Sequence, residues 1–149
     1  MLQKILESLE NSSRLQFSIV QPNGSLNSIA FEKIHQDVVA AISHLKSLGV
    51  RPRDCVGIYG DNCYAWIVMD LALITLDCVS IAIPTDAMAP SLLEESLSTY
   101  GLTLLVEVGP RGRQSSEKSK GVIFLSEELK FSDVQLCCGS DKEIPSDVF

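Results

Sequence analysis

The stretch Val56–Trp66, VGIYGDNCYAW, decides how this chain is expected to fold. It begins as a short apolar strand, breaks at Gly60, and becomes apolar again after the polar pair Asp61 and Asn62. A glycine-rich loop that cradles a nucleotide phosphate needs several glycines at a fixed spacing, and a carboxylate beside the helix N-terminus repels the phosphate. The stretch lacks G-x-G-x-x-G and carries Asp61. We therefore interpret it as a strand-to-helix corner in which Asp61 or Asn62 caps the helix.

The segments around this corner alternate between strand and helix patterns. Cys55–Tyr59 is short, apolar and bounded by turn residues, which predicts a strand buried on both faces. Residues 62–76 are apolar on nearly all sides and predict a buried crossover helix with Trp66 in the core. The same patterns predict strands at 79–83 and 102–106 and a helix at 90–100. The alternation predicts an α/β fold built on a parallel-rich sheet with flanking helices.

A β-hairpin is expected before this α/β region. Residues 15–31 contain two strand-like runs around a Pro-Asn-Gly-Ser turn at 22–25. Apolar residues then recur at steps of three and four from Phe31 to Leu48, which predicts a helix that ends at Gly49. The opening residues show the same helical spacing at Leu2, Ile5, Leu6 and Leu9.

The second half of the chain changes in character. Residues 107–121 are expected to form a polar, locally basic surface loop, followed by a strand at 122–125. This loop does not match G-x-x-x-x-G-K-[ST], so a solvated loop is favoured over an anion site; for an anion, Arg111 and Arg113 are the better candidates. Residues 126–149 form an irregular acidic segment. We treat 1–149 as one partial domain.

The composition narrows the classes of partner. The chain has 149 residues, 46% of them hydrophobic and 21% charged, with a formal net charge of −7. This balance predicts one globular domain and argues against nucleic acid as a partner, because nucleic acid selects clustered Lys and Arg. No run is long and apolar enough to predict a transmembrane segment, and no signal peptide is indicated. The five cysteines lack C-x-x-C spacing, which favours free thiols and a cytoplasmic location.

No reactive set of residues stands out. His35 and His44 are nine residues apart on one predicted helix and point to nearly opposite sides, so we interpret them as solvated helix residues. Cys137 and Cys138 have no second pair or nearby histidine to complete a metal site, which favours free thiols in a loop. We assign no catalytic, cofactor-binding or metal-binding residue.

Several short motifs nevertheless follow one another in a characteristic order along the chain. The motifs are Asn23-Gly24, Phe31–Ile34, Gly49-Val50, Asp54–Ile58, Gly60–Trp66 and Val79–Thr85. Together they resemble the N-terminal region of the acyl-adenylate-forming (AMP-dependent synthetase/ligase) superfamily, and they are most similar to long-chain acyl-CoA synthetases. The likeness covers most of residues 15–106. The chain departs from the family pattern where Tyr64-Ala65 replaces Pro-Glu and where Ala30 replaces a threonine near the helix start.

The resemblance implies an incomplete part of the family's large domain. Glu143–Phe149 resembles the segment just before the family's phosphate-binding loop, which would begin beyond Phe149. A full-length member uses ATP, Mg²⁺ and CoA to activate a fatty acid through an acyl-adenylate. The loop, a later acid pair and a lysine on a C-terminal domain carry that chemistry, so the 149-residue chain is expected to be inactive as a ligase and to bind none of these cofactors itself.

Two other readings stay open beside the fragment. The chain could be a stand-alone, non-catalytic interaction module on the same fold, or an enzyme with unrelated chemistry on an α/β scaffold. Self-association is expected for the isolated fragment, because its sheet would lack its usual neighbours, whereas a soluble monomer would favour the module. A full-length parent of the fragment could also associate peripherally with membranes.

Overall fold

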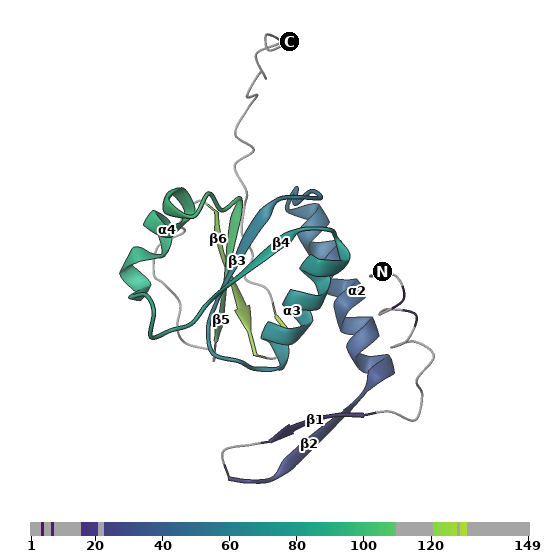
Figure 1. Ribbon diagram of the computed structural model, residues 1–149. Coiled ribbons are helices and arrows are strands. Elements are labelled where there is room, and N and C mark those ends of the chain that lie inside the picture. Colours follow the sequence, from purple (N-terminus) through teal and green to yellow (C-terminus); the bar gives the residue numbers. More distant parts are fainter. Residues whose placement is uncertain are drawn as a thin grey trace.

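The computed structural model describes most of the chain between residues 16 and 130 (Figure 1). The described residues are Lys4, Glu7, 16–20, 23–109, 121–127, Leu129 and Lys130. The helix expected from Leu2 to Leu9 lies outside the residues whose arrangement can be followed, as does the acidic segment beyond Lys130. Within the described residues the predicted α/β class is confirmed.

A two-stranded antiparallel hairpin extends away from the rest of the fold (Figure 1). It consists of β1 (Gln16–Val20) and β2 (Leu26–Ala30), and Phe17 pairs with Ile29. Gly24 adopts a φ of 81°, and the side chain of Asn23 accepts a hydrogen bond from the backbone N–H of Ser25 over 2.9 Å. The turn residues therefore set the hairpin where the sequence places it.

Helix α2 (Phe31–Ser47) follows the hairpin directly and buries one face. The buried residues are Ile34, Val38, Ala41 and Leu45. Its N-cap is Ala30, which makes no side-chain capping hydrogen bond, as expected where the family's threonine is missing. Gly49 adopts a φ of 78° just after the C-cap residue Leu48, so the predicted glycine stop is confirmed.

Four parallel strands form the central sheet. They are β3 (Cys55–Tyr59), β4 (Val79–Ile83), β5 (Leu104–Gly109) and β6 (Val122–Ser126), in the spatial order β4-β3-β5-β6. All three pairings are parallel. The first two strands have the predicted bounds. In contrast, β5 begins at Leu104 and runs to Gly109, so the strand takes in three residues expected in the loop at 107–121.

Helices cover both faces of the sheet (Figure 1). Helices α2 and α3 (Tyr64–Thr75) lie on one face, and α4 (Leu93–Thr99) lies on the other. The predicted helix at 90–100 is divided, because Pro90–Leu92 form a 3-10 turn before α4 begins. The chain thus forms three layers with the sheet in the middle.

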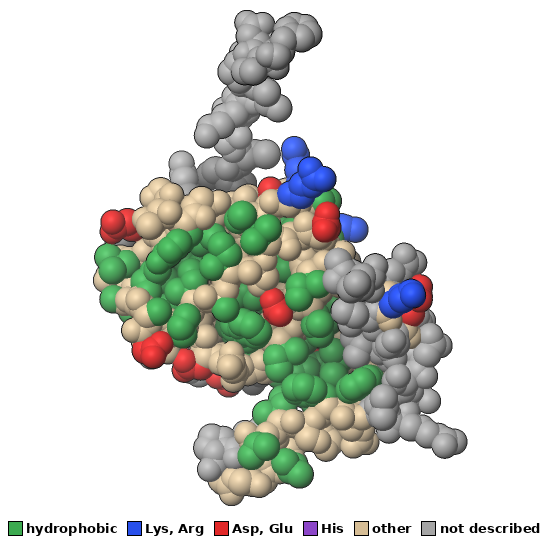
Figure 2. Space-filling view, in the orientation of Figure 1, with side chains coloured by type: hydrophobic (Ala, Val, Ile, Leu, Met, Phe, Trp, Pro, Cys, Tyr) green, Lys and Arg blue, Asp and Glu red, His purple; other side chains and the backbone are tan. Residues whose placement is uncertain are grey.

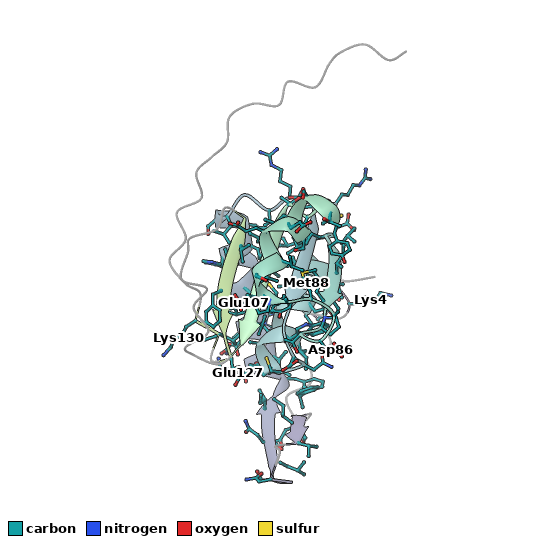
Figure 3. All side chains as sticks on the ribbon, turned by 90° about the vertical axis from the view of Figure 1, so that its left-hand side faces the viewer. Lys4, Asp86, Met88, Glu107, Glu127 and Lys130 are labelled. Carbon is teal, nitrogen blue, oxygen red and sulfur yellow. The ribbon has the colours of Figure 1, made fainter. Side chains whose placement is uncertain are left out.

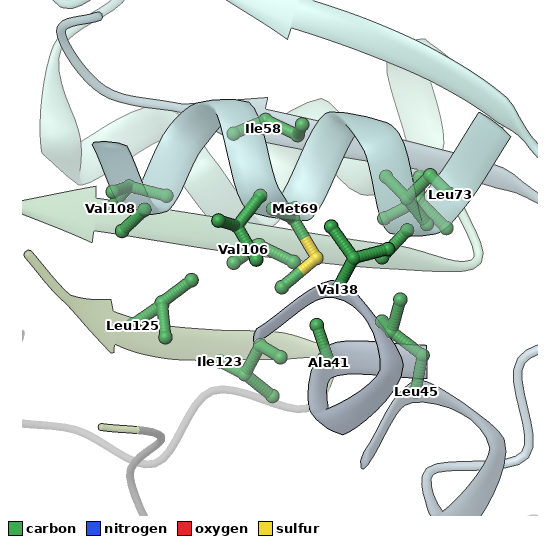
Figure 4. Close-up of a cluster of buried hydrophobic side chains, with 14 of the residues drawn as sticks. Val38, Ala41, Leu45, Ile58, Met69, Leu73, Val106, Val108, Ile123 and Leu125 are labelled. Atoms are coloured by element: carbon green, nitrogen blue, oxygen red, sulfur yellow. The ribbon is translucent and has the colours of Figure 1, made fainter. Parts of the chain in front are cut away.

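The larger apolar core lies between the sheet and the α2–α3 pair (Figure 4). Val38 and Ala41 of α2 lie near Met69 of α3 and Ile123 of β6 in this core (Figure 4). Gly57 of β3 allows close packing on the opposite face of the sheet, since a Cβ added there would lie 2.6 Å from Leu105 Cδ1. A smaller cluster around Tyr59, Ile83 and Leu93 fills that face beneath α4.

The predicted buried helix α3 is confirmed in part, since no residue of Tyr64–Thr75 is exposed. The helix buries one face, made of Ala65, Val68, Met69, Ala72 and Leu73. Trp66 is half-buried and packs against the larger core. A helix in the outer layer meets the sheet and α2 along one side only, so its uniformly apolar sequence leaves a second apolar side partly exposed.

Candidate functional site

The carboxyl ends of the four parallel strands meet at one edge of the sheet, where open α/β folds bind ligands. Gly60–Asn62 follow β3, Thr85 and Asp86 lie after β4, and Glu127 follows β6. Asp86 and Glu127 lie toward the same end of the molecule in Figure 3, as the parallel strand directions require. This carboxyl edge is the candidate site.

Gly60 makes the turn after β3 possible because it approaches the backbone of β5. A Cβ added to Gly60 would lie 2.4 Å from the carbonyl oxygen of Val108, well inside contact distance. The N–H of Gly60 donates to the carbonyl of Ile83 on the other side, over 3.2 Å. The glycine therefore fits between two strands, and its role at this position is steric.

The predicted capping role of Asp61 or Asn62 is wrong. The N-cap residue of α3 is Cys63, and no side-chain capping hydrogen bond is formed there. Instead, Thr85 donates its hydroxyl to Oδ1 of Asp61 over 2.6 Å. Because β3 and β4 are parallel neighbours, the residues that follow them lie side by side, and the carboxylate bonds across the edge rather than along its own chain.

Cys63 is a half-buried thiol at this edge. Burial raises its pKa, the backbone amides of Trp66 and Ala65 lower it in part, and the charges of Glu127 and Asp61 raise it further. The pKa of Cys78 is also raised, first by burial and then by nearby carboxylates. Both groups therefore stay protonated at neutral pH, which makes them poor nucleophiles.

Glu107 is a buried acid that the sequence interpretation placed in a surface loop. Its side chain is 4% exposed, and in β5 it is paired in register between Tyr59 and Phe124. Tyr59 in turn donates its hydroxyl to the carbonyl oxygen of Met88 over 3.0 Å. The sequence signal for the buried position of Glu107 is the run LLVEVG, in which Glu107 is the one charged residue among apolar ones.

A tight turn follows β6 at the same edge. The N–H of Ser126 donates to the carbonyl of Lys130 over 3.0 Å, and the N–H of Lys130 returns a bond to Ser126 Oγ over 3.1 Å. Ser126 is 3% exposed, so its hydroxyl serves this turn. The edge is thus held by internal polar contacts.

Other candidate residues are not brought to this edge. His35 and His44 lie on α2 and are half-buried, and burial lowers the pKa of His44. In the described part of the chain, no three His, Cys, Asp or Glu side chains are grouped to hold a metal ion. Arg111, Arg113, Cys137 and Cys138 lie outside the described residues.

A comparison with protein families decides the assignment. Residues 13–142 match the family described as AMP-binding enzyme. The chain belongs to the AMP-binding enzyme family. The superfamily resemblance drawn from the motifs is therefore confirmed, and the corner at Gly60 is part of an AMP-binding enzyme fold rather than of a dinucleotide-binding one.

Curated relatives of this AMP-binding family member are CoA ligases. The chain is 32% identical over 78 residues to a bovine protein named medium-chain acyl-CoA ligase ACSF2, mitochondrial, which covers 52% of the chain and 12% of the relative. It is 34% identical over 70 residues to the probable CoA ligase CCL6 of Humulus lupulus, covering 44% of the chain and 10% of that relative. The matches thus span a small part of each relative's length.

Solved structures share the fold of this AMP-binding family member at low identity. IdnL1 aligns over 84% of the chain and 25% of its own, with a TM-score of 0.64 and 13% identity. The fatty acid AMP ligase from Legionella pneumophila aligns over 72% of the chain and 19% of its own, with a TM-score of 0.58 and 15% identity. Among the described residues, no helix is long and apolar enough to cross a membrane.

Proposed function

We propose that this chain supplies the N-terminal part of the AMP-binding domain of a fatty-acid–CoA ligase-like enzyme. The observation that carries the proposal is the match of residues 13–142 to the AMP-binding enzyme family, and the fold agrees, since IdnL1 aligns over 84% of the chain and 25% of its own. Relatives with at least 30% identity are named as CoA ligases. The activity of such an enzyme is the ATP-dependent activation of a carboxylic acid and its transfer to CoA.

The role proposed for the chain in that reaction is structural. The candidate site does not fit a nucleotide phosphate, because Asp61 and Glu127 bring negative charge to the carboxyl edge. In addition, the backbone of β5 already occupies the space beside Gly60. Its donor set does not fit Mg²⁺ either, since the acids of the described residues do not group. We therefore propose that ATP, Mg²⁺, CoA and the fatty acid are held by other parts of the parent enzyme, and that these residues build the wall beside them.

Fatty-acid-dependent exchange between ATP and pyrophosphate tests this proposal. The purified 149-residue chain is expected to give no exchange above an enzyme-free control, because acyl-adenylate formation depends on groups that position and neutralise the phosphates. The bovine acyl-CoA ligase, assayed with a medium-chain acid, serves as positive control. Exchange by the chain that requires both ATP and a fatty acid would overturn the proposal.

A second candidate, a stand-alone interaction module on the same fold, is favoured by the two apolar clusters. One cluster fills each face of the sheet, so the described residues already build a layered core. The coding sequence after Phe149 separates the candidates: a downstream T-S-G-T-T-G run supports the fragment, and a stop codon supports the module.

We also propose a cytoplasmic location. Cys55, Cys63 and Cys78 are free thiols, which suits a reducing compartment. The bovine relative is named a mitochondrial enzyme. Cell fractionation with antibodies against this chain distinguishes the two compartments, and recovery in the mitochondrial fraction would refute the proposed location.

A further inference from the structure

The outer edge of β4 offers backbone hydrogen-bonding groups to a further strand. β4 is the terminal strand of the order β4-β3-β5-β6, and no other strand within the described residues pairs with it. The N–H of Val79 donates to the carbonyl of Asp54 over 2.9 Å, and the carbonyl of Ile83 accepts a bond from the turn after β3 over 3.2 Å. Backbone groups alternate along a strand, so those of Ser80 and Ala82 point away from β3.

This edge lacks the features by which sheet edges avoid pairing. The strand reads VSIAI, without charge or proline, and its register with β3 is unbroken from Val79 to Ile83. Val79 is 49% exposed and Ala82 is exposed, whereas no residue of the other terminal strand, β6, is exposed. Figure 2 shows hydrophobic side chains gathered on the face of the molecule that carries β4 and α4. An uncharged and largely apolar edge of this kind is a template for another strand.

We propose that two copies of this chain pair antiparallel through β4, about a two-fold axis at Ile81. In this register Ser80 of each copy lies opposite Ala82 of the other. These are the two residues whose backbone groups point outward, so each such N–H and carbonyl finds a partner. The strand is therefore complementary to itself, as an isologous interface requires.

The side chains match in the same register. Ile81 and Ile83 pack on the α4 side of the sheet, and Val79 points to that side by the strand's alternation. In the pair, Ile81 lies opposite its own copy, and exposed Val79 lies opposite Ile83. The partners are apolar on both strands, so pairing removes apolar surface from water and sets no like charges opposite one another. The inference is independent of the proposed ligase role, because it concerns the chain alone.

Sedimentation velocity over a range of protein concentrations tests the pairing. The 149-residue chain is expected to dimerise, and Ala82→Pro to weaken the dimer about tenfold or more, because each copy loses an outward N–H while the ladder with β3 keeps all of its bonds. Ala82→Val is the matched control: it keeps the N–H and adds apolar surface, so the dimer should persist. A chain that stays monomeric at every concentration, or a dimer unchanged by Ala82→Pro, overturns the proposal.

Disulfide cross-linking tests the register and does not depend on the proline variant folding. Directly opposite residues without shared hydrogen bonds have Cα atoms about 4.5 Å apart, which is within disulfide range. Under mild oxidation Ile81→Cys is therefore expected to give a covalent dimer linked between the two positions 81, identified by peptide mass spectrometry. Val39→Cys, at a 44% exposed position on α2, is the control and should not form this dimer. Equal cross-linking of both variants would refute the proposed axis.

Discussion

The hydroxyl of Tyr64 donates a hydrogen bond to Oδ2 of Asp37 over 2.7 Å and so joins the first residue of α3 to the middle of α2. The other carboxylate oxygen of Asp37 forms an ion pair with Lys33, one turn earlier on α2. The family pattern that this chain resembles has proline where Tyr64 stands. The chain therefore has a polar tie between its two packed helices that proline could not provide.

Removing this tie should destabilise the fold measurably. Tyr64→Phe keeps the ring and deletes the donor, so we expect the free energy of unfolding to fall by about 1 kcal/mol, as for a partly buried hydrogen bond. Urea unfolding followed by circular dichroism measures the change. In a double-mutant cycle with Asp37→Asn the two effects should not add, and full additivity would show that the contact contributes nothing.

The same contact predicts how stability changes at alkaline pH. Burial, and then the hydrogen bond and charge of Asp37, raise the pKa of Tyr64 far above its usual range. The folded state thus holds the phenolic proton more tightly than the unfolded state, and the resulting stability is present below about pH 10 and lost as the pH rises above it. Urea unfolding between about pH 8 and pH 11 should show a steeper loss for the wild-type chain than for Tyr64→Phe. Equal slopes would contradict the assignment.

The bond between Thr85 and Asp61 gives a test of the corrected corner. Asp61→Ala and Thr85→Val should each lower the free energy of unfolding by about 0.5–1 kcal/mol, because each breaks the same exposed hydrogen bond. Asn62→Ala is the matched control and should change it by less than about 0.5 kcal/mol, since the neighbouring amide caps no helix. Thermal unfolding of the three variants measures these changes in stability. A larger loss for Asn62→Ala would restore the capping role.

Gly60 and Gly24 form a pair that separates steric crowding from backbone strain. Both adopt positive φ angles, 151° and 81°, but a Cβ would meet the Val108 carbonyl at Gly60 and nothing within 4 Å at Gly24. We expect Gly24→Ala to cost about 1 kcal/mol and Gly60→Ala about 3 kcal/mol or more. Comparison of their urea midpoints checks the ranking. Similar losses would mean that β5 can move aside.

Elements set by local patterns could be predicted from the sequence. The bounds of β3 and β4 follow from short apolar runs between turn residues, and the end of α2 follows from Gly49. The hairpin follows from its Asn-Gly turn. In each case the residues that specify the element lie within it or beside it.

Features that depend on contacts between distant segments could not be predicted in this way. The partner of Asp61 is Thr85, which the parallel pairing of β3 and β4 brings close. Glu107 was assigned to the polar loop expected at 107–121, yet pairing on both sides carries β5 through it to Gly109. Trp66 is only half-buried, because the fully buried face of α3 consists of other residues. Each of these depends on the strand order.

The strand order also bears on how the molecule is made. β3 lies between β4 and β5, so it must be present before either neighbour can pair, and it is the first of the four strands to be synthesised. A nascent chain therefore exposes β3, α3 and β4 together and can close this unit before β5 has left the ribosome. β5 then adds to the free side of β3, and β6 adds to β5. Because every pairing spans a crossover, each addition closes a long loop, and sheet assembly follows the direction of translation.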